Sequence, residues 1–188
     1  MITDTFSEVR AQAGAENWRQ EPLTDLIGHI KSTHHSYTRQ AIVRLGPLLA
    51  TVCAAHSQDH PELLQIQAAF DGLAEELTAH LMKEEVILFP YIVRMEEAVM
   101  EGQPVMRPPF GTVGNPISMM IREHDGAGNA LRRMRQASEG YAVPAGVCPG
   151  YQDLYQALAD LETDLLQHIH LENDILFPRA VEMETRAR

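Results

Sequence analysis

Apolar residues recur at steps of three and four along most of this chain, and the pattern is clearest between residues 62 and 101. A stripe with this spacing is typical of a helix that buries one face. Two polar residues, His80 and Glu84, occupy stripe positions, so they are predicted to lie in the core and not on the wet face. The full stripe is Leu63, Ile66, Phe70, Leu73, Leu77, His80, Glu84, Ile87 and Tyr91.

The same periodicity predicts three further helices, over residues 23–56, 115–138 and 150–184. The first of them contains Gly46-Pro47, which predicts a kink or a break because proline removes a backbone hydrogen bond. The third is expected to begin with Asn115 as its N-cap, followed by a proline in the first helical position.

No segment alternates between apolar and polar residues as a half-buried strand would. Long helices on short loops favour a bundle in which neighbours run antiparallel. The sequence therefore predicts an all-α fold, an antiparallel up-down-up-down four-helix bundle over residues 21–188. Residues 1–20 show no sustained period and are expected to form an N-terminal tail.

One phrase occurs twice, at residues 80–90 and again 88 residues later at 168–178. Both copies read His-x-x-x-Glu, then two residues, an aliphatic residue and Leu-Phe-Pro. Positions four apart lie one turn above each other on a helix, so each imidazole faces the same way as its carboxylate. His80 with Glu84, and His168 with Glu172, therefore predict a dinuclear metal site between facing helices. The prolines that end the two copies predict paired kinks beside it.

A lone histidine precedes each copy at a similar distance. His124 lies 44 residues before His168, and His35 lies 45 residues before His80. The bundle would bring four imidazoles and two carboxylates to one level of the core, where unmet hydrogen bonds cost about 2–7 kcal/mol each. Metal binding removes that cost. Heptad steps back from Ile42 reach His35, whereas steps forward from Ile30 reach His34, so either of the two remains possible, with the half-to-half spacing favouring His35.

Carboxylates also flank the paired motifs. Glu76 and Asp164 lie four residues before His80 and His168, where each could hold the other ring nitrogen of its histidine. An exposed acid on a helix flank is an equally good interpretation of both. His170 is two residues from His168 and is expected to face away from it, as a solvated residue.

Composition narrows the possible partners. The net charge of −11 argues against binding to nucleic acid or to an anionic membrane. The chain has no apolar run of 18 residues and no export signal at its start, which makes the cytoplasm the expected compartment. Its two cysteines, Cys53 and Cys148, form no Cys-x-x-Cys motif, so a thiolate metal site has little support.

Several of these stretches resemble a known family. They are LIGHIKSTHHSYTR (residues 26–39), HLMKEEVILFP (80–90), NPISMMIREHDGAG (115–128) and HIHLENDILFPRA (168–180). Together they resemble the hemerythrin-like domains, and most closely the repair-of-iron-centres proteins linked to nitric oxide and oxidative stress. The resemblance covers about residues 21–184 and favours His35 over His34.

The resemblance implies a non-haem centre of two iron ions with an oxo or hydroxo bridge. The four histidines, His35, His80, His124 and His168, would be divided between the irons, and Glu84 and Glu172 would bridge them. Glu123 matches an acidic residue of the family that lines the approach to the site. At Gly128, oxygen-carrying hemerythrins place a further histidine, so this chain is not expected to be a dedicated oxygen carrier.

The implied function is repair of iron–sulfur clusters, by supplying iron or by reacting with nitric oxide. Iron–sulfur proteins would then be partners, and diatomic gases or peroxide would be ligands. Binding or sensing of oxygen, nitric oxide or iron without turnover is the alternative, and a peroxide-consuming enzyme is a third possibility. Repair proteins of full length usually carry a small N-terminal domain with a cysteine pair, which is expected to be missing here. The same ligands also accept manganese or zinc.

Overall fold

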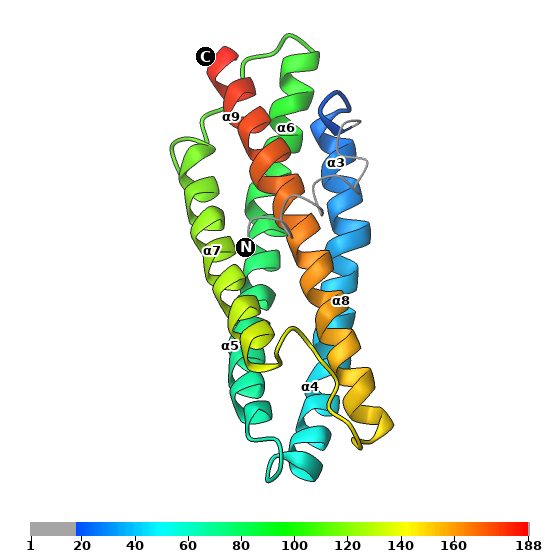
Figure 1. Cartoon of the computed structure of the whole chain (residues 1–188). Helices are drawn as coiled ribbons and strands as arrows, with labels where there is room; N and C mark the ends of the chain where they lie inside the picture. The colour runs from blue at the N-terminus through cyan, green and yellow to red at the C-terminus, as the bar shows by residue number, and fades with distance from the viewer. Residues whose placement is uncertain (1–17, 188) are drawn as a thin grey trace.

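The computed structural model describes residues 18–187 and folds them into a bundle of four antiparallel helical rods (Figure 1). In this part of the chain every regular element is helical, and no strand occurs. The predicted all-α four-helix bundle is thus confirmed. The rods consist, in chain order, of α3 (Leu23–Ile30), η1 (Lys31–His35) and α4 (Ser36–His56); α5 (Glu62–Lys83), η2 (Glu84–Leu88) and α6 (Phe89–Met100); α7 (Gly114–Ala137); and α8 (Pro149–Leu171), η3 (Glu172–Leu176) and α9 (Phe177–Arg186).

The four rods begin and end close to the predicted positions, but a break at Gly46-Pro47 and an N-cap at Asn115 are not found. The helix passes through Gly46-Pro47 without a break. Pro47 has no N–H to donate to the Val43 carbonyl four residues earlier. Both residues are exposed, so water can hydrogen-bond to the freed carbonyl oxygen. Asn115 is not an N-cap, because α7 begins one residue earlier and the Asn115 amide donates to the Phe110 carbonyl at 2.6 Å.

Three rods contain one wide, π-helical turn each: η1, η2 and η3. The turns η2 and η3 directly precede Phe89-Pro90 and Phe177-Pro178, the two positions where the sequence predicts paired kinks. A proline leaves the carbonyl four residues before it unpaired, and a wider turn accommodates that loss. Each π turn begins or ends at a candidate metal ligand, since His35 ends η1 and Glu84 and Glu172 begin η2 and η3.

The bundle has two apolar cores, one on either side of a polar layer. One core contains Ala41, Leu77 and Leu165, and the other contains Ile30, Leu88 and other residues nearer the opposite end. The candidate ligands lie between these positions on every rod. The fold thus buries them in a layer that apolar side chains seal from both ends. None of the described helices is long and apolar enough to cross a membrane.

Candidate metal centre

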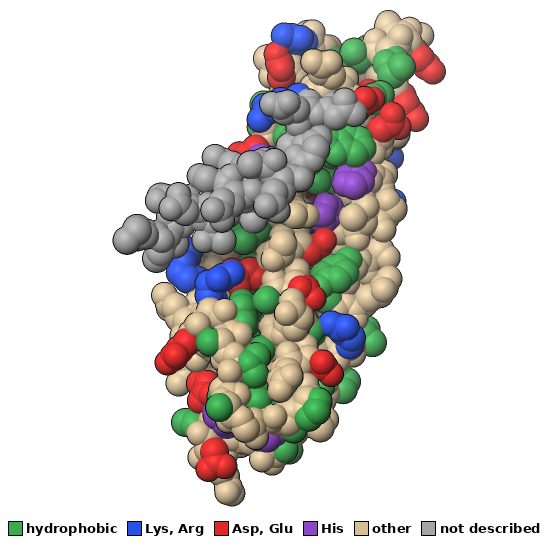
Figure 2. Space-filling model, turned by 45° about the vertical axis from the view of Figure 1, so that its right-hand side comes forward, with side chains coloured by type: hydrophobic (Ala, Val, Ile, Leu, Met, Phe, Trp, Pro, Cys, Tyr) green, Lys and Arg blue, Asp and Glu red, His purple; other side chains and the backbone are tan. Residues whose placement is uncertain are grey.

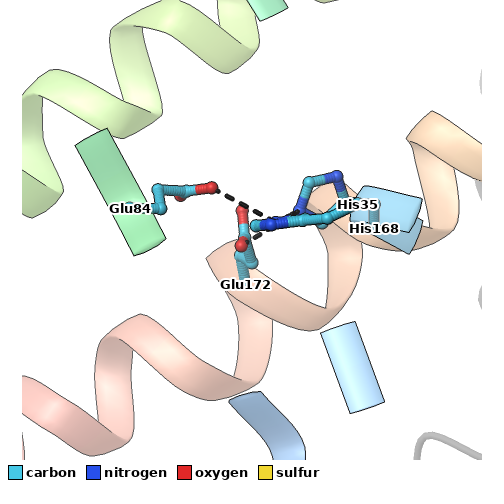
Figure 3. A group of neighbouring side chains, drawn as sticks. All are labelled: His35, Glu84, His168 and Glu172. Atoms are coloured by element: carbon cyan, nitrogen blue, oxygen red, sulfur yellow. Dashed lines mark hydrogen bonds and ion pairs between the residues drawn. The ribbon is translucent and has the colours of Figure 1, made fainter. Parts of the chain in front are cut away.

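The structure brings all six predicted ligands together in the polar layer. Their side chains form two clusters that share both glutamates, and within each cluster one ligand atom per residue lies within 4.8 Å of the others. Figure 3 shows the first cluster, in which the four side chains point toward one another from separate helical segments. The clusters are His35, Glu84, His168 and Glu172, and His80, Glu84, His124 and Glu172.

The histidines meet in pairs through their Nε2 atoms. The Nε2 atoms of His35 and His168 are 3.2 Å apart, and those of His80 and His124 are 3.1 Å apart. All four imidazoles are at most 5% exposed. Each pair joins the first or third rod to one of the two rods that carry the duplicated phrase, so the arrangement repeats across the two halves of the bundle.

The two glutamates lie between these pairs. Glu172 places Oε1 at 3.0 Å from His168 Nε2 and Oε2 at 3.1 Å from His124 Nε2, so one carboxylate reaches both pairs. Glu84 Oε2 lies 3.3 Å from His80 Nε2 and 3.5 Å from His35 Nε2. Both carboxylates are therefore positioned to bridge two cations.

Three of the imidazoles are fixed from behind by an oxygen acceptor on a different rod. His35 Nδ1 lies 2.7 Å from Glu85 Oε1, and His80 Nδ1 lies 2.8 Å from Glu123 Oε2. His124 Nδ1 lies 2.9 Å from Asn173 Oδ1. An acceptor at Nδ1 requires that nitrogen to carry the proton, so Nε2 is left with a bare lone pair.

These lone pairs and carboxylates fit a pair of cations. Bare Nε2 atoms only about 3 Å apart repel each other unless a cation lies between them. Both oxygens of Glu84 and of Glu172 are buried and make no hydrogen bond of good geometry to any described residue. Orphaned buried carboxylates are costly, and metal coordination satisfies them. Nitrogen and carboxylate ligands together suit iron, manganese or zinc.

The surroundings also set the protonation of these residues. Burial lowers the pKa of His35 to about 4, helped by the charge of His168, and burial lowers the pKa of His80 to about 4 as well. Both imidazoles are therefore neutral at pH 7, the form that binds metals. Burial and then the charge of Glu172 raise the pKa of Glu84 well above its usual value. The two carboxylates are too close to ionise together easily without a cation.

His35, and not His34, belongs to the clusters. His34 is nevertheless buried, with Nδ1 at 2.9 Å from Asp164 Oδ1. Asp164 therefore does not support His168, which was one of the two interpretations of this residue. Glu76 does not support His80 either, since Glu123 takes that position, and Glu76 lines a small crevice beside His80 and Glu123.

Sequence reasoning missed Glu85 and Asn173 as supports of the ligand imidazoles. Each directly follows a glutamate that both clusters share, at matching places in the duplicated phrase. That repeated position was the available signal. His170 faces away as predicted and pairs with Asp174, whose Oδ2 is 2.6 Å from its Nδ1. A hollow of about 870 Å³ beside α6 and the loop at residues 101–110 contains none of the six ligands, so it is separate from this centre.

Removing the support of His80 should weaken metal binding. We expect Glu123→Ala to lower the affinity for one metal ion about 10–100-fold, because the imidazole loses the acceptor that orients it. Glu123→Gln should retain most of the affinity, since its amide oxygen can still accept the Nδ1 proton. Competition titration against a chelator measures both. Equal losses in the two variants would contradict the acceptor role of Glu123.

Comparison with known proteins also indicates a cation-binding domain. Residues 29–180 match the model of the hemerythrin HHE cation binding domain. The chain is 35% identical over 170 residues to the iron-sulfur cluster repair protein YtfE of Yersinia pseudotuberculosis serotype IB (strain PB1/+), which covers 90% of this chain and 71% of that protein. The protein of the same name from Yersinia pestis (strain Pestoides F) matches with the same identity and coverage. The chain therefore belongs to the hemerythrin HHE cation binding domain family.

Proposed function

We propose that this chain is a non-haem di-iron protein that repairs iron–sulfur clusters, by supplying iron or by reacting with nitric oxide under nitrosative or oxidative stress. The observation that carries the proposal is the pair of ligand clusters sharing Glu84 and Glu172. Each cluster offers two imidazoles and two shared carboxylates, so an octahedral ion would keep positions for other ligands. The relatives named as cluster repair proteins support the choice of reaction.

In this proposal the residues have separate tasks. Glu84 and Glu172 would be shared between two cations, and the four imidazoles would supply the remaining protein ligands. Glu85, Glu123 and Asn173 keep the protons on Nδ1, so that the Nε2 lone pairs stay directed inward. The apolar cores above and below exclude water. Bound iron would supply redox chemistry and exchangeable positions for nitric oxide, oxygen or peroxide.

Transfer of iron to a damaged cluster tests the repair function. The full chain is loaded with ferrous iron without oxygen, freed of excess metal, and mixed with a [4Fe–4S] hydratase whose cluster was damaged by nitric oxide. We expect the hydratase to regain activity in proportion to the iron bound by the chain.

Two controls define this result. A membrane-separated sample, in which only free iron can reach the hydratase, should recover far less activity. Glu84→Gln protein, treated with the same iron, should also fail. Recovery no greater than in the membrane-separated sample would refute direct repair.

The alternative is reversible binding of a diatomic ligand without turnover. The same open positions favour it, and Gly128, one turn after His124, offers no side chain that could occupy one of them. A stable oxygen or nitric oxide adduct that dissociates unchanged, followed by absorption spectroscopy, would favour this function over repair.

A further inference from the structure

The support of the four ligand imidazoles is uneven. Three of them have an oxygen acceptor at Nδ1, but Nδ1 of His168 is buried and has no hydrogen-bond partner among the described residues. An imidazole without such a partner is less firmly oriented and a weaker ligand. The cation held by His35 and His168 should therefore be the more easily released of the two.

A further histidine lies directly beside His168. The rings of His34 and His168 are nearly parallel, with an angle of 4° and 5.7 Å between their centroids. This spacing is only slightly longer than the 4.9 Å between the rings of His35 and His168, which share one cluster. His34 is 4% exposed, belongs to neither cluster, and has no task in the centre described above.

His34 nonetheless has the surroundings of a metal ligand. Its Nδ1 lies 2.9 Å from Asp164 Oδ1, the same carboxylate–imidazole arrangement that Glu85 provides for His35. A carboxylate acceptor places the proton on Nδ1 and leaves a lone pair on Nε2. The pair can thus hold a divalent cation through one imidazole nitrogen, which makes a weak site.

A second imidazole continues from His34 toward the surface. The ring of His29 lies 5.6 Å from that of His34, at 90° to it. His29 is partly exposed, and Thr33 Oγ1 lies 3.3 Å from its Nδ1. Trp18, the single tryptophan of the chain, stacks on the other side of His29 at 4.8 Å. Figure 2 shows that histidine side chains reach the surface in the upper half of the molecule.

We propose that His34 and His29 form a path along which ferrous iron enters and leaves the His35–His168 site. The ion exchanges the Nε2 atom of His168 for that of His34, while water replaces His35, Glu84 and Glu172. It then exchanges His34 Nε2 for an imidazole nitrogen of His29. At each step one iron–nitrogen bond forms as another breaks, and the oxidation state does not change. Weak, successive sites suit a path, because each must hold the ion without trapping it.

This path rests on the proposed function, since it gives the iron being supplied a way out. A purely structural role is the competing explanation, in which the His34–Asp164 bond only ties η1 to α8. His34→Gln separates the two, because its amide can still donate to Asp164 but gives no imidazole ligand. Asp164→Ala tests the same pair from the other side, since it removes the acceptor that fixes the imidazole.

Iron release to a chelator provides the test. The full chain carrying two ferrous ions is mixed without oxygen with an excess of a colour-forming ferrous chelator, and absorbance is followed. For the unaltered chain we expect two phases of one ion each. His34→Gln and Asp164→Ala should begin with the same iron content and slow the faster phase about tenfold or more. His29→Gln should slow it less, because water can replace a ligand near the surface.

His170→Gln is the matched control, because His170 also pairs with an aspartate but faces away from the centre. It should leave both phases unchanged. Unchanged fast phases in both His34→Gln and Asp164→Ala would overturn the path, and so would an equal slowing in His170→Gln. A lower starting iron content in His34→Gln would overturn it too, by making His34 a structural residue or a ligand of the centre. This assay contains no iron–sulfur protein, so it tests the path separately from the repair function. The path can be upheld when repair fails, and repair can be upheld when the path fails.

Discussion

Glu84→Gln is expected to abolish binding of the metal pair while leaving the metal-free chain at least as stable as before. Glutamine keeps the shape of the side chain but loses the anionic oxygens shared by both clusters. Two cations held close together need that negative charge. The affinity for both ions should therefore fall by more than about 100-fold, which exceeds the loss expected when a residue that supports a ligand imidazole is removed.

The stability of the metal-free variant follows from burial. Glu84 is fully buried, and burial and Glu172 raise its pKa well above the usual value, so a carboxylate there is costly without metal. A neutral amide removes that cost. Metal analysis after gel filtration measures the first effect, and urea unfolding of chelator-treated protein measures the second.

Glu96→Gln is the matched control on the same rod. Glu96 is also buried, but its carboxylate accepts hydrogen bonds from the Leu23 and Thr24 backbone N–H groups at 2.6 and 2.8 Å. This variant should lose about 1–3 kcal/mol of unfolding free energy and keep both metals. If Glu84→Gln retained two metals, or if its metal-free form were destabilised as much as Glu96→Gln, the bridging role would be refuted.

The internal repeat explains how much could be predicted. His80 and Glu84 were placed in the core because a helical stripe runs through them, and the second copy placed His168 and Glu172 in the same way. The repeat extends further than the motif, since Glu184 lies 88 residues after Glu96 and accepts a hydrogen bond from the Val113 N–H at the start of α7, at 3.0 Å. Both glutamates thus hold the beginning of a rod that contributes one imidazole to the clusters.

The supporting contacts could not be predicted because they cross between rods. Spacing within one helix shows which residues share a face, but it does not show which side chain of a neighbouring helix lies opposite. Asp164 was therefore assigned to His168 on its own helix, whereas it reaches His34 on another. Similarly, Glu85 follows a core residue and so appears to leave the core seam, yet it contacts His35 across the bundle.

Removal of the metals is expected to lower the melting temperature of the chain by about 15–30 °C. A ligand present at about 1,000 times its dissociation constant stabilises the folded state by about 4 kcal/mol, and two such ions add about 8 kcal/mol. For a chain of this size each kcal/mol corresponds to about 2–4 °C. Calorimetry of metal-loaded and chelator-treated protein measures the shift.

The metal-free chain should still unfold cooperatively, because the apolar cores on both sides of the polar layer do not depend on the ions. Their side chains continue to pack the four rods together, while the centre loses only the bonds that metals supply. Glu84→Gln is the control here as well, since its melting temperature should be nearly the same with and without added iron. If the unaltered protein melted at the same temperature with metal and after chelator treatment, metal binding would contribute nothing to its stability. The buried polar layer would then satisfy its own polar groups, and a metal centre at Glu84 and Glu172 would be refuted.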